Sequence, residues 1–216
     1  MKDSLCPFCQ EDKNRNANVI GKNRIIAETD NFIIFPTVGG FVENYQLIAP
    51  KKHINCFGQL TANEWNELKR IITWQRRINK QYFCSSSLMF EHGALMTNNE
   101  SGKSIIHAHL HIFPSNCSLL DDIRKYNFSI QEIIDISQLT EICYKYESYL
   151  YYSDLDEKDY IITHQGLPSQ FLRKVLADSL GILSWNWRES PYLESIENSL
   201  KFYKVNPQVY GYLNGG

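Results

Sequence analysis

The sequence predicts an α+β fold in its first half and an α/β extension in its second half. In the first half, short apolar runs end at prolines, as strands do, and one long segment repeats its apolar residues with the period of a helix. In the second half the pattern changes after Pro114, yet no Gly/Ser-rich linker follows. We therefore expect two parts, residues 1–116 and 117–216, that pack directly on each other.

Four strands are expected in the first half. Residues 31–36 and 45–49 are apolar runs that stop at a proline, and residues 88–95 form a third run that contains a glycine. A polar loop separates this run from the fourth strand, residues 104–113, which also stops at a proline.

A long helix is expected between the second and third strands. Thr61 is a plausible N-cap, and Glu64 three positions later completes the capping-box pattern. The apolar residues then recur on one face as far as Tyr82. They are Leu68, Ile71, Ile72 and Ile78.

The second half is expected to mix helices with a hairpin. Residues 117–146 read as helical and irregular segments, and residues 149–152 and 159–164 read as hairpin arms across a polar turn. A helix should begin at residue 168 or 169 and stop at Gly181, because proline suits a helix start and glycine a helix end. Another helix is expected over residues 192–203.

Composition places the chain among ordinary globular proteins. Of its 216 residues, 43% are hydrophobic and 21% are charged, which excludes a disordered or collagen-like chain. Its 22 basic and 24 acidic residues give a formal charge of −2, so bulk nucleic-acid binding is not expected. No apolar run approaches the roughly 18 to 20 residues of a membrane span, and the first ten residues lack a signal-peptide core. We expect a cytoplasmic protein without a membrane partner.

Three histidines alternate with apolar residues near the end of the first half. In a strand, alternate side chains share a face, so His107, His109 and His111 would line one side. Neighbouring histidine Cα atoms would lie roughly 6.6 Å apart and the outer two about 13 Å apart. This spacing favours a row of imidazoles along an extended polyanion over a single three-histidine metal cup. A single histidine on a strand face usually has a structural role. Burying three imidazoles for structure alone would cost desolvation free energy without an evident gain, so a functional role is expected.

Two of the six cysteines, Cys6 and Cys9, have a spacing that suits metal or redox chemistry. A redox pair, two buried thiols without a ligand and a zinc site are all open from these residues alone. The absence of a preceding thioredoxin-like strand weighs against the redox pair.

The segment His-Ala-His-Leu-His-Ile-Phe at residues 107–113 is similar to the signature of the histidine-triad (HIT) family of nucleotide hydrolases and transferases. Residues 45–54 resemble the family's strand that leads into a Pro-Lys-x-His turn, and residues 98–104 resemble its phosphate-contacting loop. The resemblance spans about half the chain. It implies a HIT-like antiparallel sheet with flanking helices.

The resemblance also implies roles by position. His109 would attack the α-phosphorus and form a nucleotidyl-histidine intermediate, and His111 would hydrogen-bond the phosphate or the leaving group. Lys103 departs from the glutamine that close relatives often carry, which leaves the leaving group open. The loop residues that would contact the substrate are Asn99, Gly102, Lys103 and Ser104.

A structural zinc ion is implied in the same way. Bacterial members and the related hexose-1-phosphate uridylyltransferases join an N-terminal Cys-x-x-Cys to the histidine of the Pro-Lys-x-His turn and to the first triad histidine. Two sulfurs and two nitrogens close a tetrahedral site with no open position. The ligands here would be Cys6, Cys9, His53 and His107.

Two further groups have a functional and a plain interpretation. His164, Gln170 and Arg173 lie where a strand should meet a helix N-terminus, which can bind an anion or can simply be a capped surface helix. Glu91 and His92 are either a polar pair on a hairpin or neighbours of the substrate or the zinc.

The sequence therefore predicts an enzyme that hydrolyses a nucleotide phosphoanhydride or phosphoramidate through His109. The alternatives are a nucleotidyl transferase or dinucleoside-polyphosphate phosphorylase with the same intermediate, and a non-catalytic nucleotide or RNA-end binding module. A homodimer is possible, since many HIT proteins join their central sheets, although the extension could block that edge.

Overall fold

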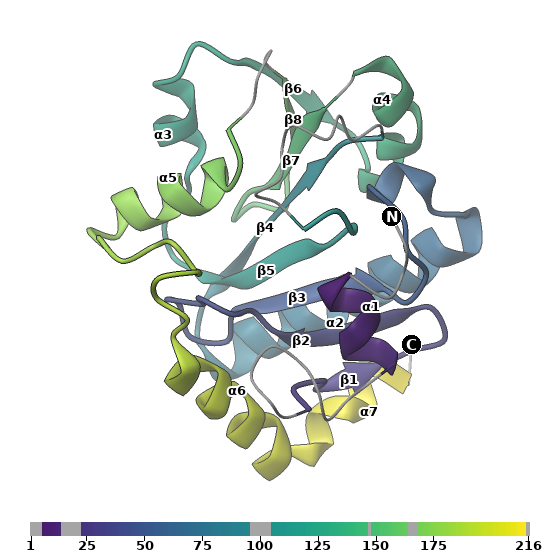
Figure 1. Cartoon of the computed structure of the whole chain (residues 1–216), viewed down its shortest axis with the longest axis vertical. Coiled ribbons are helices and arrows are strands. Elements are labelled where there is room, and N and C mark those ends of the chain that lie inside the picture. Colours follow the sequence, from purple (N-terminus) through teal and green to yellow (C-terminus); the bar gives the residue numbers. More distant parts are fainter. Residues whose placement is uncertain (1–5, 14–22, 96–104, 147, 164–167, 215–216) are drawn as a thin grey trace.

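The computed structural model describes residues 6–13, 23–95, 105–146, 148–163 and 168–214. Through this part of the chain runs one eight-stranded sheet, in the order β1-β2-β3-β5-β4-β7-β8-β6, with every neighbouring pair antiparallel (Figure 1). The α+β class, with an antiparallel sheet and flanking helices, is confirmed. The strands are β1 (Ala27–Glu28), β2 (Phe32–Pro36), β3 (Gln46–Pro50), β4 (Ser86–Gly93), β5 (Leu110–Ser115), β6 (Ser129–Ile133), β7 (Tyr149–Ser153) and β8 (Asp159–Thr163).

The helices flank this sheet. The α-helices are α1 (Pro7–Lys13), α2 (Ala62–Tyr82), α3 (Leu120–Arg124), α4 (Leu139–Lys145), α5 (Phe171–Ser179), α6 (Leu193–Val205) and α7 (Gly211–Asn214). The short 3₁₀ turns are η2 (Phe57–Gln59), η4 (Ile136–Gln138) and η5 (Pro207–Tyr210).

Helix α2 begins as the sequence predicts. The Thr61 side chain accepts a hydrogen bond from the Glu64 backbone N–H, and the Glu64 carboxylate accepts one from the Thr61 N–H at 2.7 Å. This capping box satisfies donors that a helix start otherwise leaves free. The helix then continues for 21 residues and ends at Tyr82.

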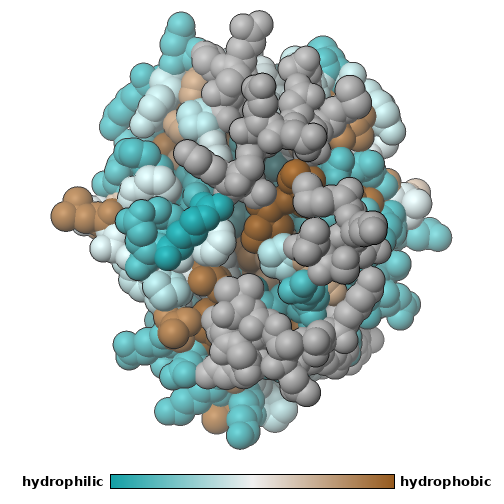
Figure 2. Space-filling model, viewed as in Figure 1, coloured by the Kyte–Doolittle hydropathy of each residue, from teal (hydrophilic) through white to brown (hydrophobic). Residues whose placement is uncertain are grey.

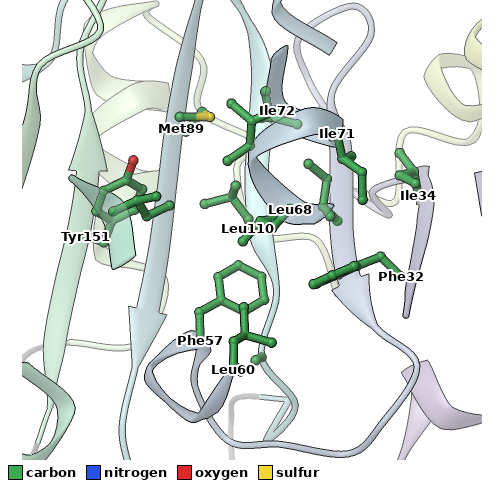
Figure 3. Close-up of a cluster of buried hydrophobic side chains, with 14 of the residues drawn as sticks. Phe32, Ile34, Phe57, Leu60, Leu68, Ile71, Ile72, Met89, Leu110 and Tyr151 are labelled. Atoms are coloured by element: carbon green, nitrogen blue, oxygen red, sulfur yellow. The ribbon is translucent and has the colours of Figure 1, made fainter. Parts of the chain in front are cut away.

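One face of the sheet packs on α2 and forms the main core. Leu68 and Ile71 of α2 are fully buried in a cluster with apolar side chains of β2, β3, β4 and β5. Figure 3 shows part of this cluster. Turn η2 closes one end of this core with Phe57. The sheet residues in the same core cluster as α2 include Phe32, Ile34, Ile48, Met89, Leu110, Ile112, Tyr149 and Tyr151.

The opposite face carries two separate clusters. At one side, Phe8 of α1 packs with Cys6 and Cys9 on residues of β2 and β3, among them Phe35. At the other side, α3 and α5 pack on β4, β5, β7 and β8, where Phe90 is a central residue. The histidine-bearing end of β5 lies on this same face.

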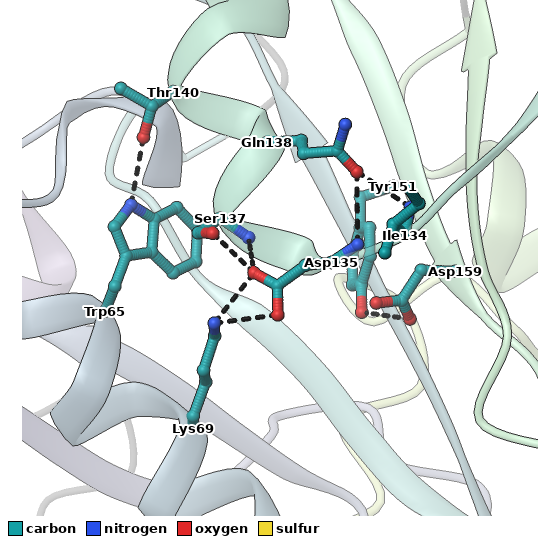
Figure 4. Close-up of polar contacts among 9 residues, drawn as sticks. All are labelled: Trp65, Lys69, Ile134, Asp135, Ser137, Gln138, Thr140, Tyr151 and Asp159. Carbon is teal, nitrogen blue, oxygen red and sulfur yellow. Dashed lines mark hydrogen bonds and ion pairs between the residues drawn. The ribbon is translucent and has the colours of Figure 1, made fainter. Parts of the chain in front are cut away.

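The strands of the two predicted parts lie in one sheet. Strand β7 pairs with β4 over five residue pairs, from Met89↔Ser153 to Gly93↔Tyr149. Side chains of α2 also reach the second half (Figure 4). Lys69 forms an ion pair with Asp135 at 2.7 Å, and the Trp65 indole N–H donates to the Thr140 hydroxyl at 3.0 Å. The division at residue 116 stays a prediction.

Two predicted elements differ from the structure. The strand expected over residues 104–113 begins only at Leu110, because its pairing with β3 starts at Ile48↔Leu110 and the Ala108 N–H instead donates to the Ile54 carbonyl. His107 and His109 thus precede the strand and do not form a straight row with His111. Strand β6, within residues 117–146, was not expected.

The remaining elements of the second half agree with the sequence. Strands β7 and β8 form the predicted hairpin, with Tyr152 opposite Tyr160. Helix α5 begins at Phe171, slightly later than expected, and ends before Gly181, whose φ of +67° suits glycine. Helix α6 covers the expected range.

No helix in the described ranges is long and apolar enough to cross a membrane. On the face seen in Figure 2, hydrophobic residues form short patches between hydrophilic ones.

Candidate active site and metal centre

The candidate active site lies on the second face of the sheet, between α1 and α5. His111 occupies the centre of this face, since it is paired with Leu47 of β3 on one side and Phe90 of β4 on the other. His109 lies just before the strand, with its ring centre 5.0 Å from that of His111 and 5.1 Å from that of Phe8. The two later histidines of the triad are therefore direct neighbours.

The geometry around His109 determines which of its nitrogens can react. Its Nδ1 lies 2.8 Å from the backbone carbonyl of His107. A carbonyl only accepts hydrogen bonds, so Nδ1 carries the proton and Nε2 keeps its lone pair. Burial lowers the pKa of His109; the bond to the His107 carbonyl opposes this effect, and the positive charge of Arg173 adds to it. The ring is thus neutral at pH 7, with a nucleophilic Nε2.

His111 is held by two aromatic residues. The phenyl ring of Phe90 stacks on it with ring centres 4.4 Å apart, and the Tyr45 hydroxyl lies 3.0 Å from its Nδ1. Burial, with smaller contributions from His109 and Arg173, holds the pKa of His111 well below its usual value of 6.5. His111 is therefore also neutral at pH 7, and it can serve as a hydrogen-bond donor.

His92 faces the same site from β4. The register that pairs Phe90 with His111 would place His92 opposite His109, one step beyond the end of the β4–β5 ladder. Burial, and then the neighbouring His109, lower the pKa of His92 to about 4. The sequence left open whether Glu91 and His92 are a polar pair on a hairpin or neighbours of the substrate or the zinc. For His92 the geometry favours a place next to the substrate. Glu91 lies on the α2 face of the sheet, away from the histidines.

Arg173 of α5 brings the second half of the chain to this site. It is only 3% exposed, and its guanidinium lies over the rings of Phe41 and Tyr45. One terminal nitrogen donates to the carbonyls of Gly39 at 2.7 Å and Trp185 at 3.1 Å, while its Nε has no hydrogen-bond partner among the described residues. Arg173 is therefore a buried cation beside the histidines. The sequence had instead suggested an accessible anion-binding group at the start of a helix.

The residue before α5, Gln170, has a left-handed backbone with φ of +60°. Its side-chain oxygen is buried and has no partner among the residues that the structure describes. The other predicted substrate contacts lie outside the described residues. They are Asn99, Gly102, Lys103, Ser104 and His164.

A second cluster gathers the four residues that were predicted as metal ligands. The Cys6 sulfur lies 3.3 Å from Nδ1 of His107, and the Cys9 sulfur lies 3.4 Å from Nδ1 of His53 and 3.6 Å from Nδ1 of His107. All four ligand atoms lie within 4.8 Å of one another. His107 is oriented by its other nitrogen, since Nε2 donates to the Pro50 carbonyl at 2.8 Å and leaves the Nδ1 lone pair toward the sulfurs. This cluster could hold a metal ion.

The sequence profile of the HIT domain family matches residues 20–117, which contain all three triad histidines and His53. Residues 20–117 are therefore the part of the chain that is similar to a HIT domain. The second half of the chain, which supplies Arg173, lies beyond it.

Solved structures with a HIT domain resemble part of the chain. A hypothetical histidine-triad nucleotide-binding protein from Sulfolobus tokodaii is 21% identical, covering 51% of this chain and 68% of that one at a TM-score of 0.40. A HIT family hydrolase from Clostridium thermocellum is 17% identical, with 51% and 90% covered at a TM-score of 0.35. Yeast Ap4A phosphorylase in complex with AMP is 13% identical, with 62% and 57% covered at a TM-score of 0.39. A search of curated proteins found no match.

Two residues beside the HIT domain's histidines were not singled out as site residues from the sequence. In the sequence Tyr45 looks like part of an apolar strand. Its polar role becomes visible only in the structure, through the hydrogen bond between its hydroxyl and His111. Phe8 reads as a spacer between Cys6 and Cys9, yet its ring contacts both His107 and His109. A signal for Tyr45 does exist, because it lies at the start of the strand that leads to the Pro-Lys-x-His turn.

Proposed function

We propose that the chain hydrolyses a nucleotide phosphoanhydride or phosphoramidate through a nucleotidyl-His109 intermediate. The observation that carries this proposal is the bond from His109 Nδ1 to the His107 carbonyl, which leaves Nε2 as the nucleophile. A neutral imidazole with a directed lone pair is what an attack on phosphorus requires. The HIT domain that surrounds it supports the same chemistry.

The reaction would have two steps. The His109 Nε2 lone pair attacks the α-phosphorus, a P–N bond forms, and the bond from phosphorus to the leaving group breaks with its electron pair on that group. Water then attacks the same phosphorus, the P–N bond breaks, and the nucleotide leaves while His109 recovers its lone pair. His111 would donate a hydrogen bond to a phosphoryl oxygen or to the leaving group, and the charge of Arg173 would favour the anionic substrate.

The remaining substrate contacts belong to this proposal. The loop before the triad would hold the non-bridging oxygens through side chains and backbone N–H groups. Gln170, whose buried amide oxygen has no partner within the described ranges, would contact the substrate as well. The loop residues and the remaining contact are Asn99, Gly102, Lys103, Ser104 and His164.

We also propose that Cys6, Cys9, His53 and His107 bind one structural zinc ion. Two thiolates and two imidazoles are typical zinc donors, and in a tetrahedral site sulfur and nitrogen ligands lie about 3.6 Å apart. The sulfur–nitrogen distances of 3.3, 3.4 and 3.6 Å fit this arrangement. With all four positions taken by protein, zinc would tie α1 to the triad segment and take no part in the reaction.

The extension limits how a homodimer could form by strand addition. Strand β7 occupies the edge of β4, and the edge strands of the described sheet are β1 and β6, so strand addition between two copies would use one of these two.

The test is a panel of dinucleoside polyphosphates, nucleoside phosphoramidates and nucleotide sugars, incubated with the wild type and with His109→Asn. The asparagine amide can still donate to the His107 carbonyl but provides no nucleophile, so loss of activity reports on chemistry. In water labelled with heavy oxygen, hydrolysis places the label in the released nucleotide. Products formed with phosphate or another acceptor instead would indicate the phosphorylase or transferase, and binding without any turnover would indicate the non-catalytic module. Full turnover by His109→Asn would refute the proposal.

A further inference from the structure

The hydroxyl of Tyr45 is buried beside His111, and the cation of Arg173 lies over the Tyr45 ring. Tyr45 is 1% exposed, and its oxygen is 3.0 Å from Nδ1 of His111. The guanidinium carbon of Arg173 is 5.6 Å from the centre of the Tyr45 ring. Burial raises the pKa of Tyr45, and the charge and hydrogen-bonding capacity of Arg173 act in the opposite direction. These three side chains come from the residue just before β3, from β5 and from α5, so the fold alone brings them together.

The direction of the Tyr45–His111 hydrogen bond follows from the arginine. The positive charge of Arg173 over the tyrosine ring favours the orientation of the hydroxyl that turns its oxygen toward the cation and its proton away from it. The single hydroxyl proton of Tyr45 is then directed toward the other neighbour, which is Nδ1 of His111. A neutral imidazole that accepts at Nδ1 must carry its proton on Nε2.

Among the described residues, Tyr45 is the one that forms a hydrogen bond with Nδ1 of His111. Phe90 covers a face of the ring at 4.4 Å through stacking, and a phenyl ring has no hydrogen-bonding group in the ring plane of His111. Within the described part of the chain, the direction of the Tyr45 hydroxyl therefore favours one tautomer of His111.

We propose that Arg173, acting through Tyr45, holds His111 in the tautomer with an unprotonated Nδ1 and a protonated Nε2. This inference rests on the proposed function for its purpose: the Nε2–H of His111 becomes a donor toward the phosphoryl group that the Nε2 lone pair of His109 attacks. Tyr45 and Arg173 are positioning residues in this account. The second half of the chain contributes to the HIT site by setting a hydrogen-bond direction.

Helix α5 is well anchored for this role. Phe171, Leu172 and Val175 pack in the cluster that also contains Phe90 and Tyr45. The bonds from Arg173 to two backbone carbonyls, those of Gly39 and Trp185, fix the guanidinium at its far end. The cation therefore has little freedom to turn away from the tyrosine.

The tautomer can be read directly, without substrate, from nitrogen-15 NMR of the imidazole nitrogens in the full-length, metal-loaded protein. The wild type should show His111 with a protonated Nε2. In Tyr45→Phe the ratio of the Nδ1-protonated to the Nε2-protonated tautomer should rise about fivefold, the change expected for the loss of one hydrogen bond of about 1 kcal/mol. Arg173→Met should shift the same ratio in the same direction. Tyr160→Phe, a buried tyrosine on β8 in the same sheet, is the matched control and should leave the ratio unchanged.

Three results would overturn the proposal: His111 protonated on Nδ1 in the wild type, an unchanged ratio in Tyr45→Phe, or a shift in Tyr45→Phe that Arg173→Met does not reproduce. If Arg173→Met does not fold, Arg173→Gln replaces it, because glutamine also removes the positive charge and should shift the ratio in the same direction. Where a substrate is turned over, Tyr45→Phe should lower kcat about fivefold with KM little changed. Because the NMR result needs no turnover, failure of this inference and failure of the proposed hydrolysis are told apart.

Discussion

Glu91 gives a pH dependence of stability that can be worked out from its surroundings. The carboxyl is 1% exposed, on the α2 face of β4, where it accepts hydrogen bonds from the Phe57 backbone N–H at 2.8 Å and from the Tyr149 hydroxyl at 2.9 Å. Burial raises its pKa to about 7, and the two hydrogen bonds oppose the rise without cancelling it. We predict that Glu91→Gln, which keeps the size and an acceptor oxygen, stabilises the protein above pH 7.

The sign follows from proton binding. Between its ordinary value of 4.5 and about 7, the folded protein keeps a proton on Glu91 that the unfolded chain has lost, so the free energy of unfolding falls as the pH rises through this window. At about 1.4 kcal/mol per pKa unit, the fall amounts to about 3 kcal/mol. Stability from this group is complete below pH 4.5 and is lost above about 7. Glutamine does not titrate, so the variant lacks this slope.

The assay is urea unfolding of both proteins at a series of pH values on either side of this window. The difference between them, Glu91→Gln minus wild type, cancels the titration of all other groups and should rise by about 3 kcal/mol from low to high pH. Glu132→Gln, at an exposed glutamate on β6, is the control and should give a flat difference. A flat difference for Glu91→Gln, or one that falls with pH, would refute the burial argument.

Two further predictions concern the metal cluster and the close contact of Gly39 with the second half of the chain. Metal analysis of the purified protein should find about one zinc per chain, and the variant Cys6→Ser/Cys9→Ser should bind none and unfold at a lower temperature. The control Cys117→Ser, at an exposed cysteine, should match the wild type. Zinc retained by the double variant would contradict the proposed site. Gly39→Ala should lower the free energy of unfolding by about 2 kcal/mol, because φ is +76° and a Cβ would come within 2.3 Å of the Trp187 side chain. At the control position Gly211 a Cβ would meet no atom within 4 Å, so Gly211→Ala should change stability by less than about 1 kcal/mol. Equal unfolding midpoints for the two variants would contradict this prediction.

The elements that the sequence predicts well are those with local signals. Helix α2 carries both its cap at Thr61 and its apolar face within its own residues, and β2 and β3 are apolar runs next to prolines. Strand β6 has no such signal, since of its residues only Ile133 is buried. It is a strand because β8 offers an edge to pair with, and that partner lies far along the sequence.

The candidate site divides in the same way. The triad and the four metal-cluster residues were predicted from motifs, and the structure brings the four together. The bend that sends His107 to the cysteines and leaves His109 before the strand could not be predicted, because it depends on bonds to the carbonyls of Pro50 and Ile54. The burial of Arg173 beside Tyr45 depends on how α5 packs, which no local pattern contains.

Mass spectrometry after a rapid quench without acid can detect the proposed covalent bond between His109 and phosphorus. With a substrate from the panel, we expect a nucleotidyl adduct on the peptide that contains His109, formed and lost at rates compatible with turnover, and no adduct in His109→Asn. Turnover by the wild type with no adduct on this residue, or with an adduct on His111 or His92 instead, would contradict it.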